Sequence, residues 1–390
     1  MEKLKVKNFG PISNADINFG DLTLFVGPQA SGKSILLQLI KLIIDRDNIP
    51  AVLHLNNYDW GRDKDKLLEL FFGEAMSSIW TNKTEIKFND RIFTTSSLLS
   101  TKQNDVSQAK NERLFYVPAQ RIVTMSQGWP RAFGTFDIGD PFVLKQFSET
   151  VRLLMEKETS KVMGAQANVF PKPGRIKEPL RKMLDSSIFQ GGEIMSDDSS
   201  LKKRFIMQVG SSRLPFMTWS AGQKEFMPLL LSFYHLIPSS KVSLRDNVKW
   251  VVIEEPEMGL YPRAIESIMV VFLELIARGY KVIVSTHSPV LLELAWALKY
   301  VKEYKGTPND LFELFSLPKS ASLQNVFKTV IQEKSLNTYY FNLQKSGAVV
   351  EDISSLDAGS EDKAVSNWGG LSEFGSRASD IVSKLVANAI

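Results

Sequence analysis

The chain has 390 residues, and 47 Lys and Arg face 43 Asp and Glu, for a net charge of +4. This charge is too small to indicate a nucleic-acid-binding protein by itself, and the length fits two domains or one large α/β domain with an insertion. Because cysteine is absent, disulfides, thiolate zinc sites and cysteine nucleophiles are excluded. We find no signal-peptide core and no apolar segment of membrane-spanning length, and we expect a cytoplasmic protein without membrane contact.

The N-terminal residues predict β-strands that lead into a glycine-rich loop. Residues 3–7 and 14–26 have strand patterns and are bounded by Gly-Pro and Gly-Asp turns. The loop has the form Gly-x-x-x-x-Gly-Lys-Ser, and apolar residues at helical spacing follow it, which is the pattern of a phosphate-binding loop. Its members are Gly27, Pro28, Gln29, Ala30, Ser31, Gly32, Lys33 and Ser34.

The residue types of this loop suit a nucleotide with magnesium. Gly27 and Gly32 allow backbone angles and a close approach that let successive N–H groups face phosphate oxygens. The N-terminal end of the following helix adds positive charge. Lys33 can reach the β- and γ-phosphates, and the Ser34 hydroxyl is suited to ligate Mg²⁺. The sequence therefore predicts ATP and Mg²⁺ as ligands.

The next part of the chain has a weaker pattern. We expect a helix over 64–79, a strand over 85–88, a polar and mobile stretch over 96–111, and a short apolar strand over 114–117. Gln120 follows that last strand. Its amide could link the metal or the attacking water to the segment that comes next.

An insertion of about 90 residues is expected over 121–210, well within single-domain size. It contains predicted helices over 141–163 and 178–189, and residues 191–194 and 204–209 look like the strands of a small hairpin. Heptads do not persist long enough for an extended coiled coil.

The second half of the chain carries three short motifs. Ser220, Gly222 and Gln223 precede an apolar helix, an apolar strand ends in Glu254-Glu255, and His287 follows another apolar strand. Strands that alternate with helices of this length favour a largely parallel, helix-covered sheet. The final residues predict a hairpin over 339–352 and a closing helix over 377–389.

These motifs together complete one hydrolytic site. Glu254 would hold the Mg²⁺ shell, and Glu255 would polarise the attacking water as general base, since carboxylates at strand ends face the ligand in such sheets. His287 is placed to sense the γ-phosphate after its own strand.

The order of the phosphate loop, Gln120, Ser-x-Gly-Gln, Glu-Glu-Pro-Glu and Ser-Thr-His-Ser-Pro resembles ABC-type ATPase heads of the SMC, RecF and OLD class. It is most similar to the stand-alone prokaryotic AAA-type ATP-binding proteins of anti-phage defence operons. The resemblance implies an α/β P-loop ATPase head with a mixed sheet and a mainly helical insertion. It also implies that Ser220, Gly222 and Gln223 contact the γ-phosphate of ATP held by the opposite subunit of a homodimer or an assembly of dimers.

The resemblance divides the chain into four segments. Residues 1–120 and 211–300 would form the two halves of the ATPase head, 121–210 the insertion, and 301–390 an accessory segment that completes the head. The chain departs from the family pattern at two positions. Glu254 stands where many relatives have aspartate, and Ala221 stands where the Ser-x-Gly-Gln signature of the family has glycine. The Ala221 methyl group could crowd the phosphate, which would make ATP hydrolysis slow.

Three functions remain open from the sequence. The first is an ATP-driven regulator or scaffold for a separate effector, a nuclease or toxin, in anti-phage defence. The second is an SMC- or RecF-like ATPase that clamps DNA in repair or chromosome maintenance, with basic residues of the insertion on the phosphates. The third, a transporter subunit, fits the ATP site but not the insertion. The basic residues are Lys172, Arg175, Lys177, Arg181, Lys182, Lys202, Lys203 and Arg204.

Overall fold

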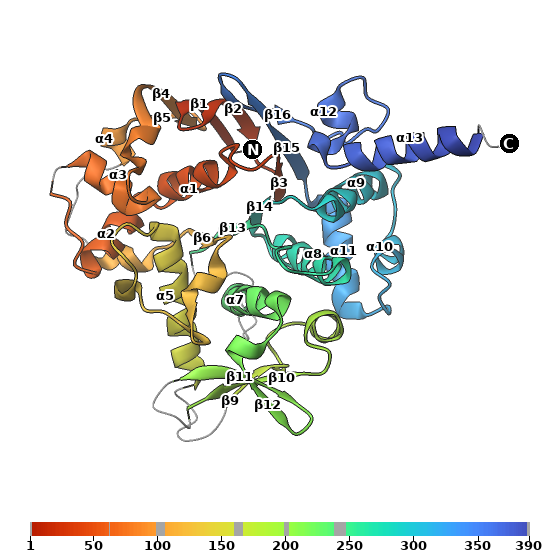
Figure 1. Ribbon diagram of the computed structural model, residues 1–390, viewed down its shortest axis with the longest axis horizontal. Coiled ribbons are helices and arrows are strands. Elements are labelled where there is room, and N and C mark those ends of the chain that lie inside the picture. The colour runs from red at the N-terminus through yellow and green to blue at the C-terminus, as the bar shows by residue number, and fades with distance from the viewer. Residues whose placement is uncertain are drawn as a thin grey trace.

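A ten-stranded mixed sheet forms the centre of the computed structural model, which describes residues 2–61, 63–98, 106–159, 167–198, 203–237 and 247–387 (Figure 1). The strand order is β5-β4-β1-β2-β16-β15-β3-β14-β13-β6. In chain order the strands are β1 (Lys3–Phe9), β2 (Ile12–Asn18), β3 (Leu22–Val26), β4 (Trp80–Phe88), β5 (Arg91–Phe93), β6 (Leu114–Val117), β13 (Trp250–Glu254), β14 (Lys281–Ser285), β15 (Leu336–Gln344) and β16 (Gly347–Asp352).

Strands β15, β3, β14, β13 and β6 run parallel to one another. Every residue of β3, β13 and β6 is buried, as expected for strands that helices cover on both faces. The pairing aligns Glu254 with Ser285 and Ser285 with Phe25, so the carboxyl ends of three neighbouring strands lie level at one edge of the sheet.

Helices cover both faces of the sheet, and each face has its own apolar core. Alternate residues of one strand enter opposite cores: Leu24 packs in one and Phe25 in the other. Helices α1 to α4 and the first residues of α5 supply the core on the Phe25 side, whereas the rest of α5 and helices α6 to α11 supply the core on the Leu24 side. The helices are α1 (Lys33–Ile44), α2 (Asn48–Leu55), α3 (Lys64–Phe72), α4 (Thr95–Leu98), α5 (Phe142–Thr159), α6 (Glu178–Leu184), α7 (Ala221–Leu236), α8 (Pro262–Ala277), α9 (Pro289–Glu303), α10 (Pro308–Leu314), α11 (Ala321–Glu333), α12 (Lys363–Ser366) and α13 (Glu373–Ala387).

A second, four-stranded antiparallel sheet with the order β12-β11-β10-β9 lies beyond α7 (Figure 1). Strands β10 (Glu193–Asp197) and β11 (Arg204–Val209) are the predicted hairpin, which is confirmed. The flanking strands β9 (Ala167–Phe170) and β12 (Ser212–Pro215) were not expected from the sequence, because Ala-Asn-Val-Phe and Ser-Arg-Leu-Pro form neither a continuous apolar run nor a regular alternation. A two-stranded ribbon, β7 (Met125–Ser126) with β8 (Trp129–Pro130), precedes α5.

Several predicted elements differ in extent from the structure. The strand region expected over 14–26 consists of two strands, β2 and β3, which are separated at residues 19–21, where the Gly20-Asp21 turn was expected. The helix expected over 64–79 ends at Phe72, because Gly73 has a φ of 116°, and a short 3₁₀ helix, η1 (Met76–Ile79), follows. Within the stretch 96–111, residues 106–110 form the 3₁₀ helix η2 (Val106–Lys110), and residues 99–105 lie outside the described residues.

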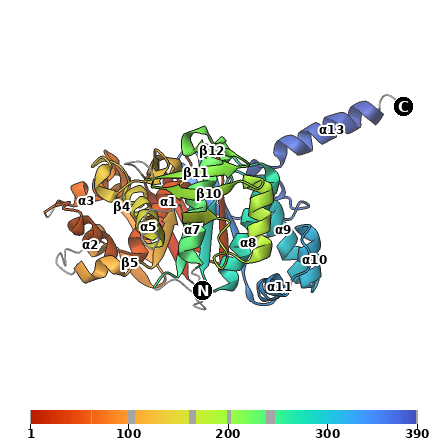
Figure 2. The same ribbon diagram turned by 90° about the horizontal axis from the view of Figure 1, so that it is seen from below.

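The C-terminal elements agree with the sequence. Strands β15 and β16 form the predicted hairpin, and α13 begins four residues before the predicted helix. Helix α13 buries none of its described residues and projects away from the body of the protein (Figure 2). Within the described ranges, no helix combines the length and apolar character needed to span a bilayer.

A buried ionic cluster joins α1 to β6. The Nζ atom of Lys41, which is fully buried, lies 2.6 Å from Asp45 Oδ2 and 2.7 Å from Glu112 Oε1. Asp45 in turn accepts hydrogen bonds from the backbone N–H groups of Arg113 (2.8 Å) and Leu114 (3.1 Å). The cluster therefore fixes the end of the helix that starts at the phosphate-binding loop to the beginning of strand β6.

Candidate active site

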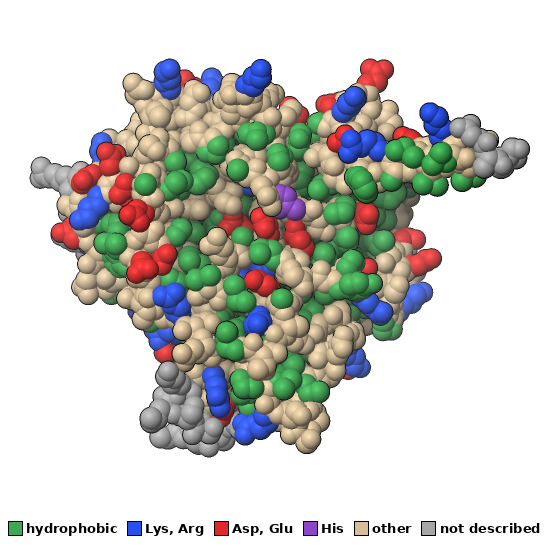
Figure 3. All heavy atoms as spheres, in the orientation of Figure 1, with side chains coloured by type: hydrophobic (Ala, Val, Ile, Leu, Met, Phe, Trp, Pro, Cys, Tyr) green, Lys and Arg blue, Asp and Glu red, His purple; other side chains and the backbone are tan. Residues whose placement is uncertain are grey.

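The candidate site lies at the carboxyl ends of β3, β14 and β13. The phosphate-binding loop follows β3, and His287 follows β14. Glu254 is the last residue of β13, and Glu255 comes directly after it. Because parallel strands in this register end at the same edge, three motifs that are far apart in the sequence come together. Figure 3 shows acidic side chains gathered around a histidine near the middle of the face in view.

The phosphate-binding loop has the backbone that its glycines predict. Gly27 has a φ of 144° and Gly32 a φ of 93°. A Cβ atom on Gly27 would lie 2.9 Å from the Phe341 carbonyl oxygen, and one on Gly32 would lie 2.8 Å from Pro11 Cγ. Both the conformation and the close approach therefore require glycine at these two positions.

Lys33 is nearly buried and turns back onto its own loop. Its Nζ atom donates to the carbonyl oxygens of Gly27 at 2.9 Å and of Pro28 at 2.8 Å. Burial lowers the pKa of Lys33, and the nearby carboxylates of Glu255, Glu254 and Glu257 raise it in part. Among the described residues, the Lys33 ammonium group has only these neutral carbonyl oxygens within hydrogen-bond distance, which makes it a suitable partner for phosphate oxygens.

A cavity of about 220 Å³ unites the loop with the residues that follow the two neighbouring strands. Residues 29–34 line it, together with Glu255 and His287. The Nε2 atom of His287 lies 3.5 Å from Glu255 Oε1, and both side chains are about 30% exposed (31% and 30%). The structure thus brings together the phosphate loop, the predicted general base and the predicted γ-phosphate sensor.

Glu254 is buried behind this cavity. Its Oε2 atom accepts a hydrogen bond from the Ala119 N–H at 3.2 Å, whereas its Oε1 atom has no hydrogen-bond partner among the described residues. Burial raises the pKa of Glu254, and the nearby Ser34 and Tyr116 hydroxyls and the Ala119 N–H lower it in part. A buried carboxylate oxygen without a partner, beside the Ser34 hydroxyl, is the oxygen donor set that Mg²⁺ prefers, so these residues fit the metal.

The backbone turns sharply at Glu255. Its φ of 41° is in the left-handed region, and its N–H donates to the Ser285 carbonyl oxygen at 2.9 Å. A non-glycine residue in this conformation costs free energy and persists only where its surroundings fix it. The turn directs the Glu255 side chain to the cavity while the Glu254 side chain remains buried.

Glu257 is a further site residue, to which the sequence analysis gave no role. Its Oε1 atom accepts hydrogen bonds from the Thr286 hydroxyl at 2.7 Å and from the His287 N–H at 2.6 Å. The carboxylate therefore joins the turn after β13 to the turn after β14 and fixes the backbone of His287. The only signal in the sequence was the third acidic residue of Glu-Glu-Pro-Glu.

Arg121 is the second residue that the sequence analysis missed. It is fully buried and donates from Nε to the Glu225 carbonyl oxygen at 3.0 Å and from Nη1 to the Glu254 carbonyl oxygen at 3.1 Å. Both Nη atoms also lie 3.3 Å from the Glu255 carbonyl oxygen. Burial lowers the pKa of Arg121, and the carboxylates around it, Glu225 first, raise it in part. One guanidinium thus holds α7 to the end of β13.

Gln120 precedes Arg121 and is exposed, but it is not among the residues that line the cavity. It stands directly before the short 3₁₀ helix η3 (Arg121–Thr124). Its predicted contact with the metal or water stays a prediction.

The signature residues lie at the start of α7 and do not line the cavity. Ser220 caps the helix: its Oγ atom accepts from the Gln223 N–H at 3.3 Å, and the Gln223 side chain accepts from the Ser220 N–H at 3.1 Å. Ser220 and Ala221 are exposed. Their contact with ATP of a second subunit stays a prediction.

Gly222 packs directly on the turn that follows the carboxylates. A Cβ atom on Gly222 would lie 2.5 Å from the Gly259 carbonyl oxygen, and Gly259 itself has a φ of 69°. No side chain fits between the two backbones, so the start of α7 and the turn after β13 are in contact without intervening atoms.

Family comparisons match two parts of the chain. Residues 1–129 match the family described as "AAA ATPase domain", and residues 210–293 match the one described as "AAA domain, putative AbiEii toxin, Type IV TA system". These segments contain the phosphate-binding loop, Gln120, the Ser-x-Gly-Gln motif and the strands that end in Glu254 and before His287. These matches confirm the resemblance to AAA-type ATPases in both parts of the chain, and the mixed α/β fold is confirmed as well.

Solved structures with similarity to the chain include Smc heads and an ABC cassette. A SmcHead bound to the C-winged helix domain of ScpA is 13% identical, with a TM-score of 0.45 and coverage of 90% of this chain and 96% of that chain. The SMC head domain from Thermotoga maritima is 13% identical, with a TM-score of 0.34 and coverage of 90% and 97%. A dimeric bacterial ABC transporter cassette is 14% identical, with a TM-score of 0.34 and coverage of 74% and 90%. None of the curated proteins compared with the chain matches it.

We predict that Gly222→Ala lowers the free energy of unfolding by about 1–3 kcal/mol, because its methyl group must displace the Gly259 backbone. The change would be measured by urea unfolding. Gly134→Ala is the matched control: an added Cβ there meets nothing within 4 Å, and we expect a change within about 0.5 kcal/mol. Equal effects of the two substitutions would contradict a tight contact at Gly222.

Proposed function

We propose that this chain is a P-loop ATPase of the ABC and SMC type, which binds ATP with Mg²⁺ and hydrolyses it to ADP and phosphate at sites shared between two copies of the chain. The observation that carries the proposal is the cavity lined by the phosphate-binding loop, Glu255 and His287. It offers phosphate ligands, a base and a hydrogen-bonding group within one small space, which is what phosphoryl transfer to water requires.

Each residue would have a separate task. Lys33 and the loop N–H groups would bind the β- and γ-phosphates, and Ser34, Glu254 and Gln120 would hold the Mg²⁺ shell. Mg²⁺ bound there neutralises charge on the phosphate oxygens. Glu255 would take a proton from the water that attacks the γ-phosphorus as the bond to the β-phosphate oxygen breaks, and His287 would donate to the γ-phosphate. Glu257 and Arg121 are positioning residues for the two turns.

The second copy of the chain would complete the site. Ser220, Gly222 and Gln223 stand apart from the cavity of their own chain, and Ser220 is exposed at a helix N-terminus, where backbone N–H groups favour an anion. A two-fold pair would place each signature on the ATP of the other copy. ATP would then join the copies and hydrolysis would release them, because only the triphosphate offers a γ-phosphate to both.

We predict that Glu255→Gln retains ATP affinity but lowers the hydrolysis rate by at least about a hundred-fold, because the amide cannot accept the proton. The variant should also accumulate as an ATP-dependent dimer in size-exclusion chromatography with light scattering. Glu351→Gln provides the matched control, since its carboxylate accepts a hydrogen bond from Asn342 in the β15–β16 hairpin and does not line the cavity. Hydrolysis at the parental rate by Glu255→Gln would exclude Glu255 as the base.

The shared site can be tested by mixing two inactive variants. Lys33→Ala removes the phosphate-binding cation, and Ser220→Arg blocks the signature. In a mixture at equal amounts about half of the dimers contain one chain of each kind, and in those dimers one of the two sites has both parts intact. We therefore predict that mixing restores ATP hydrolysis. If the mixture stays as inactive as either variant, each site is built from one chain alone.

The proposed biological role is to regulate a separate effector, a nuclease or toxin, in anti-phage defence. The support is the family resemblance and the description of the family that matches residues 210–293. That description names a toxin of a toxin–antitoxin system. The alternative, a DNA clamp, has less support, because most basic residues of the insertion already have acidic partners. These pairs are Lys172 and Arg175 with Glu158, Lys177 with Glu274, Lys182 with Glu178, and Arg204 with Asp197.

We predict that purification of the Glu255→Gln chain together with the products of its neighbouring genes retains one effector protein in the presence of ATP. Its release by a phage trigger would be followed by the effector's nuclease or toxin activity. Strong, salt-sensitive binding of duplex DNA in a mobility-shift measurement, with no retained protein, would instead favour the clamp.

A further inference from the structure

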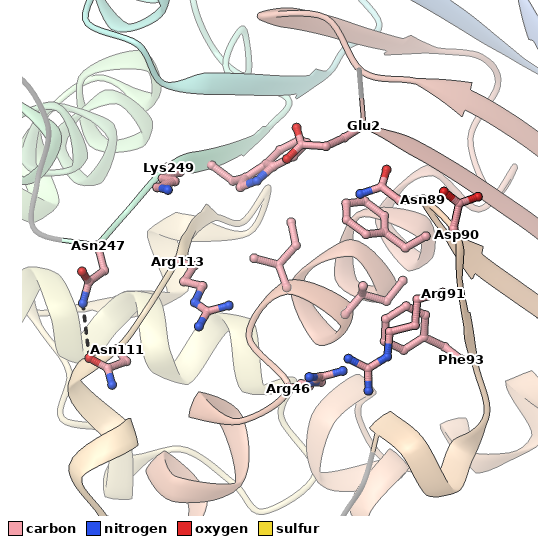
Figure 4. Close-up of a pocket in the computed structure, with 14 residues that line it drawn as sticks. Glu2, Arg46, Asn89, Asp90, Arg91, Phe93, Asn111, Arg113, Asn247 and Lys249 are labelled. Atoms are coloured by element: carbon pink, nitrogen blue, oxygen red, sulfur yellow. Dashed lines mark hydrogen bonds between the residues drawn. The ribbon is translucent and has the colours of Figure 1, made fainter.

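A second and larger cavity, of about 1050 Å³, lies at the opposite end of the parallel strands (Figure 4). It opens beside the residues that precede β6 and β13, where Asn111, Arg113, Asn247 and Lys249 lie. The C-terminal end of α1 and the β4–β5 turn form the other walls. Strands β5 and β6 are the two edges of the ten-stranded sheet, so the sheet curls until both of its edges border one space.

Four cationic side chains from separate parts of the chain line this cavity. Arg46 follows α1, Arg91 begins β5, Arg113 precedes β6 and Lys249 precedes β13. Figure 4 shows the guanidinium groups of Arg46, Arg91 and Arg113 turned into the same space. The negative end of the α1 dipole favours a cation at Arg46. It does not explain the cations Arg91 and Lys249, which lie in other parts of the chain.

The acidic residues of the cavity do not neutralise these cations. Glu2 pairs with Lys281, and Asp90 lies 3.5 Å from Lys87, and neither lysine lines the cavity. Arg46 lies 3.6 Å from Asp47, which is largely exposed. Arg91, Arg113 and Lys249 have no ion pair within the described parts of the chain. Like charges that converge in a concave site raise its positive potential and favour an anion.

The backbone that carries two of the arginines is rigid. Asp45, immediately before Arg46, belongs to the buried Lys41 cluster, and its carboxylate also accepts the Arg113 N–H at 2.8 Å. The cluster thus fixes both arginines at their backbones, and both side chains line the cavity. Asn89, Asn111 and Asn247 add amide groups, of which Asn247 Nδ2 donates to Asn111 Oδ1 at 3.2 Å.

We propose that this cavity is a second anion site, separate from the phosphate-binding loop, for a nucleotide-sized ligand that carries at least two phosphate groups. The volume of the cavity is much larger than a single phosphate needs. It matches the largest pockets that bind small ligands. Arginines form paired hydrogen bonds with phosphate oxygens, and three of them can serve more than one phosphate. The partly buried side chains of Phe88 and Ile44 provide apolar wall for the remainder of the ligand.

The test uses the full chain with Lys33→Ala, so that the phosphate-binding loop does not contribute. Tripolyphosphate, ADP and a short 5′-phosphorylated oligonucleotide are titrated by calorimetry. We expect tripolyphosphate to bind, with an affinity that falls as NaCl is raised from about 50 mM to about 200 mM. If ADP binds more tightly than the oligonucleotide, the natural ligand is a free nucleotide. If the oligonucleotide binds more tightly than ADP, the natural ligand is the phosphorylated end of a nucleic-acid strand.

Arg113→Gln and Lys249→Gln should each weaken tripolyphosphate binding by about ten-fold or more, since each removes a charged hydrogen-bond donor. Arg377→Gln on α13 and Lys328→Gln on α11 are exposed controls and should leave the affinity unchanged. Arg91→Gln is the alternative if Arg113→Gln fails to fold, as judged by thermal unfolding. Absence of binding in the Lys33→Ala chain, or binding that these cavity substitutions leave unchanged, would overturn the proposal.

Discussion

One buried guanidinium holds the candidate active site in shape. Arg121 donates to backbone carbonyl oxygens of three residues, two at the end of β13 and one in the first turn of α7. The left-handed turn at Glu255 needs such a restraint, because it directs consecutive carboxylates to different surroundings. Arginine suits this task better than lysine, since its planar fork can donate to several acceptors at once. The turn at Gln120, the end of strand β13 and the start of helix α7 therefore depend on a single side chain.

The parts of the site that follow one another in the chain could be predicted from the sequence. The phosphate-binding loop needs glycines at fixed spacing, and Glu254 ends an apolar strand, so both leave a local pattern. Arg121 and Glu257 could not be found in this way. Their partners lie 104 and 30 residues away, at Glu225 and His287, and a contact across that separation leaves no periodic signal in the sequence.

The same reasoning applies to the fold. Strands β3, β6, β13 and β14 are short, mostly apolar runs, and each was predictable as a strand. The second sheet was only half predicted, because the apolar residues of β11 indicate a strand, whereas the four residues of β9 and of β12 form neither an apolar run nor a regular alternation. The curl that brings β5 and β6 to one cavity depends on packing around α1, and the packing of Phe19 against Trp250 and Phe88 across that core is visible only in three dimensions.

The contact between Gly222 and Gly259 has a consequence for a paired assembly. The Gly259 turn follows Glu255 and Glu257 of the chain's own candidate site, whereas the helix start at Gly222 would serve the proposed site of its neighbour. Two backbones that touch without side chains between them cannot move independently. The two ATP sites of the proposed pair would therefore be coupled through this contact.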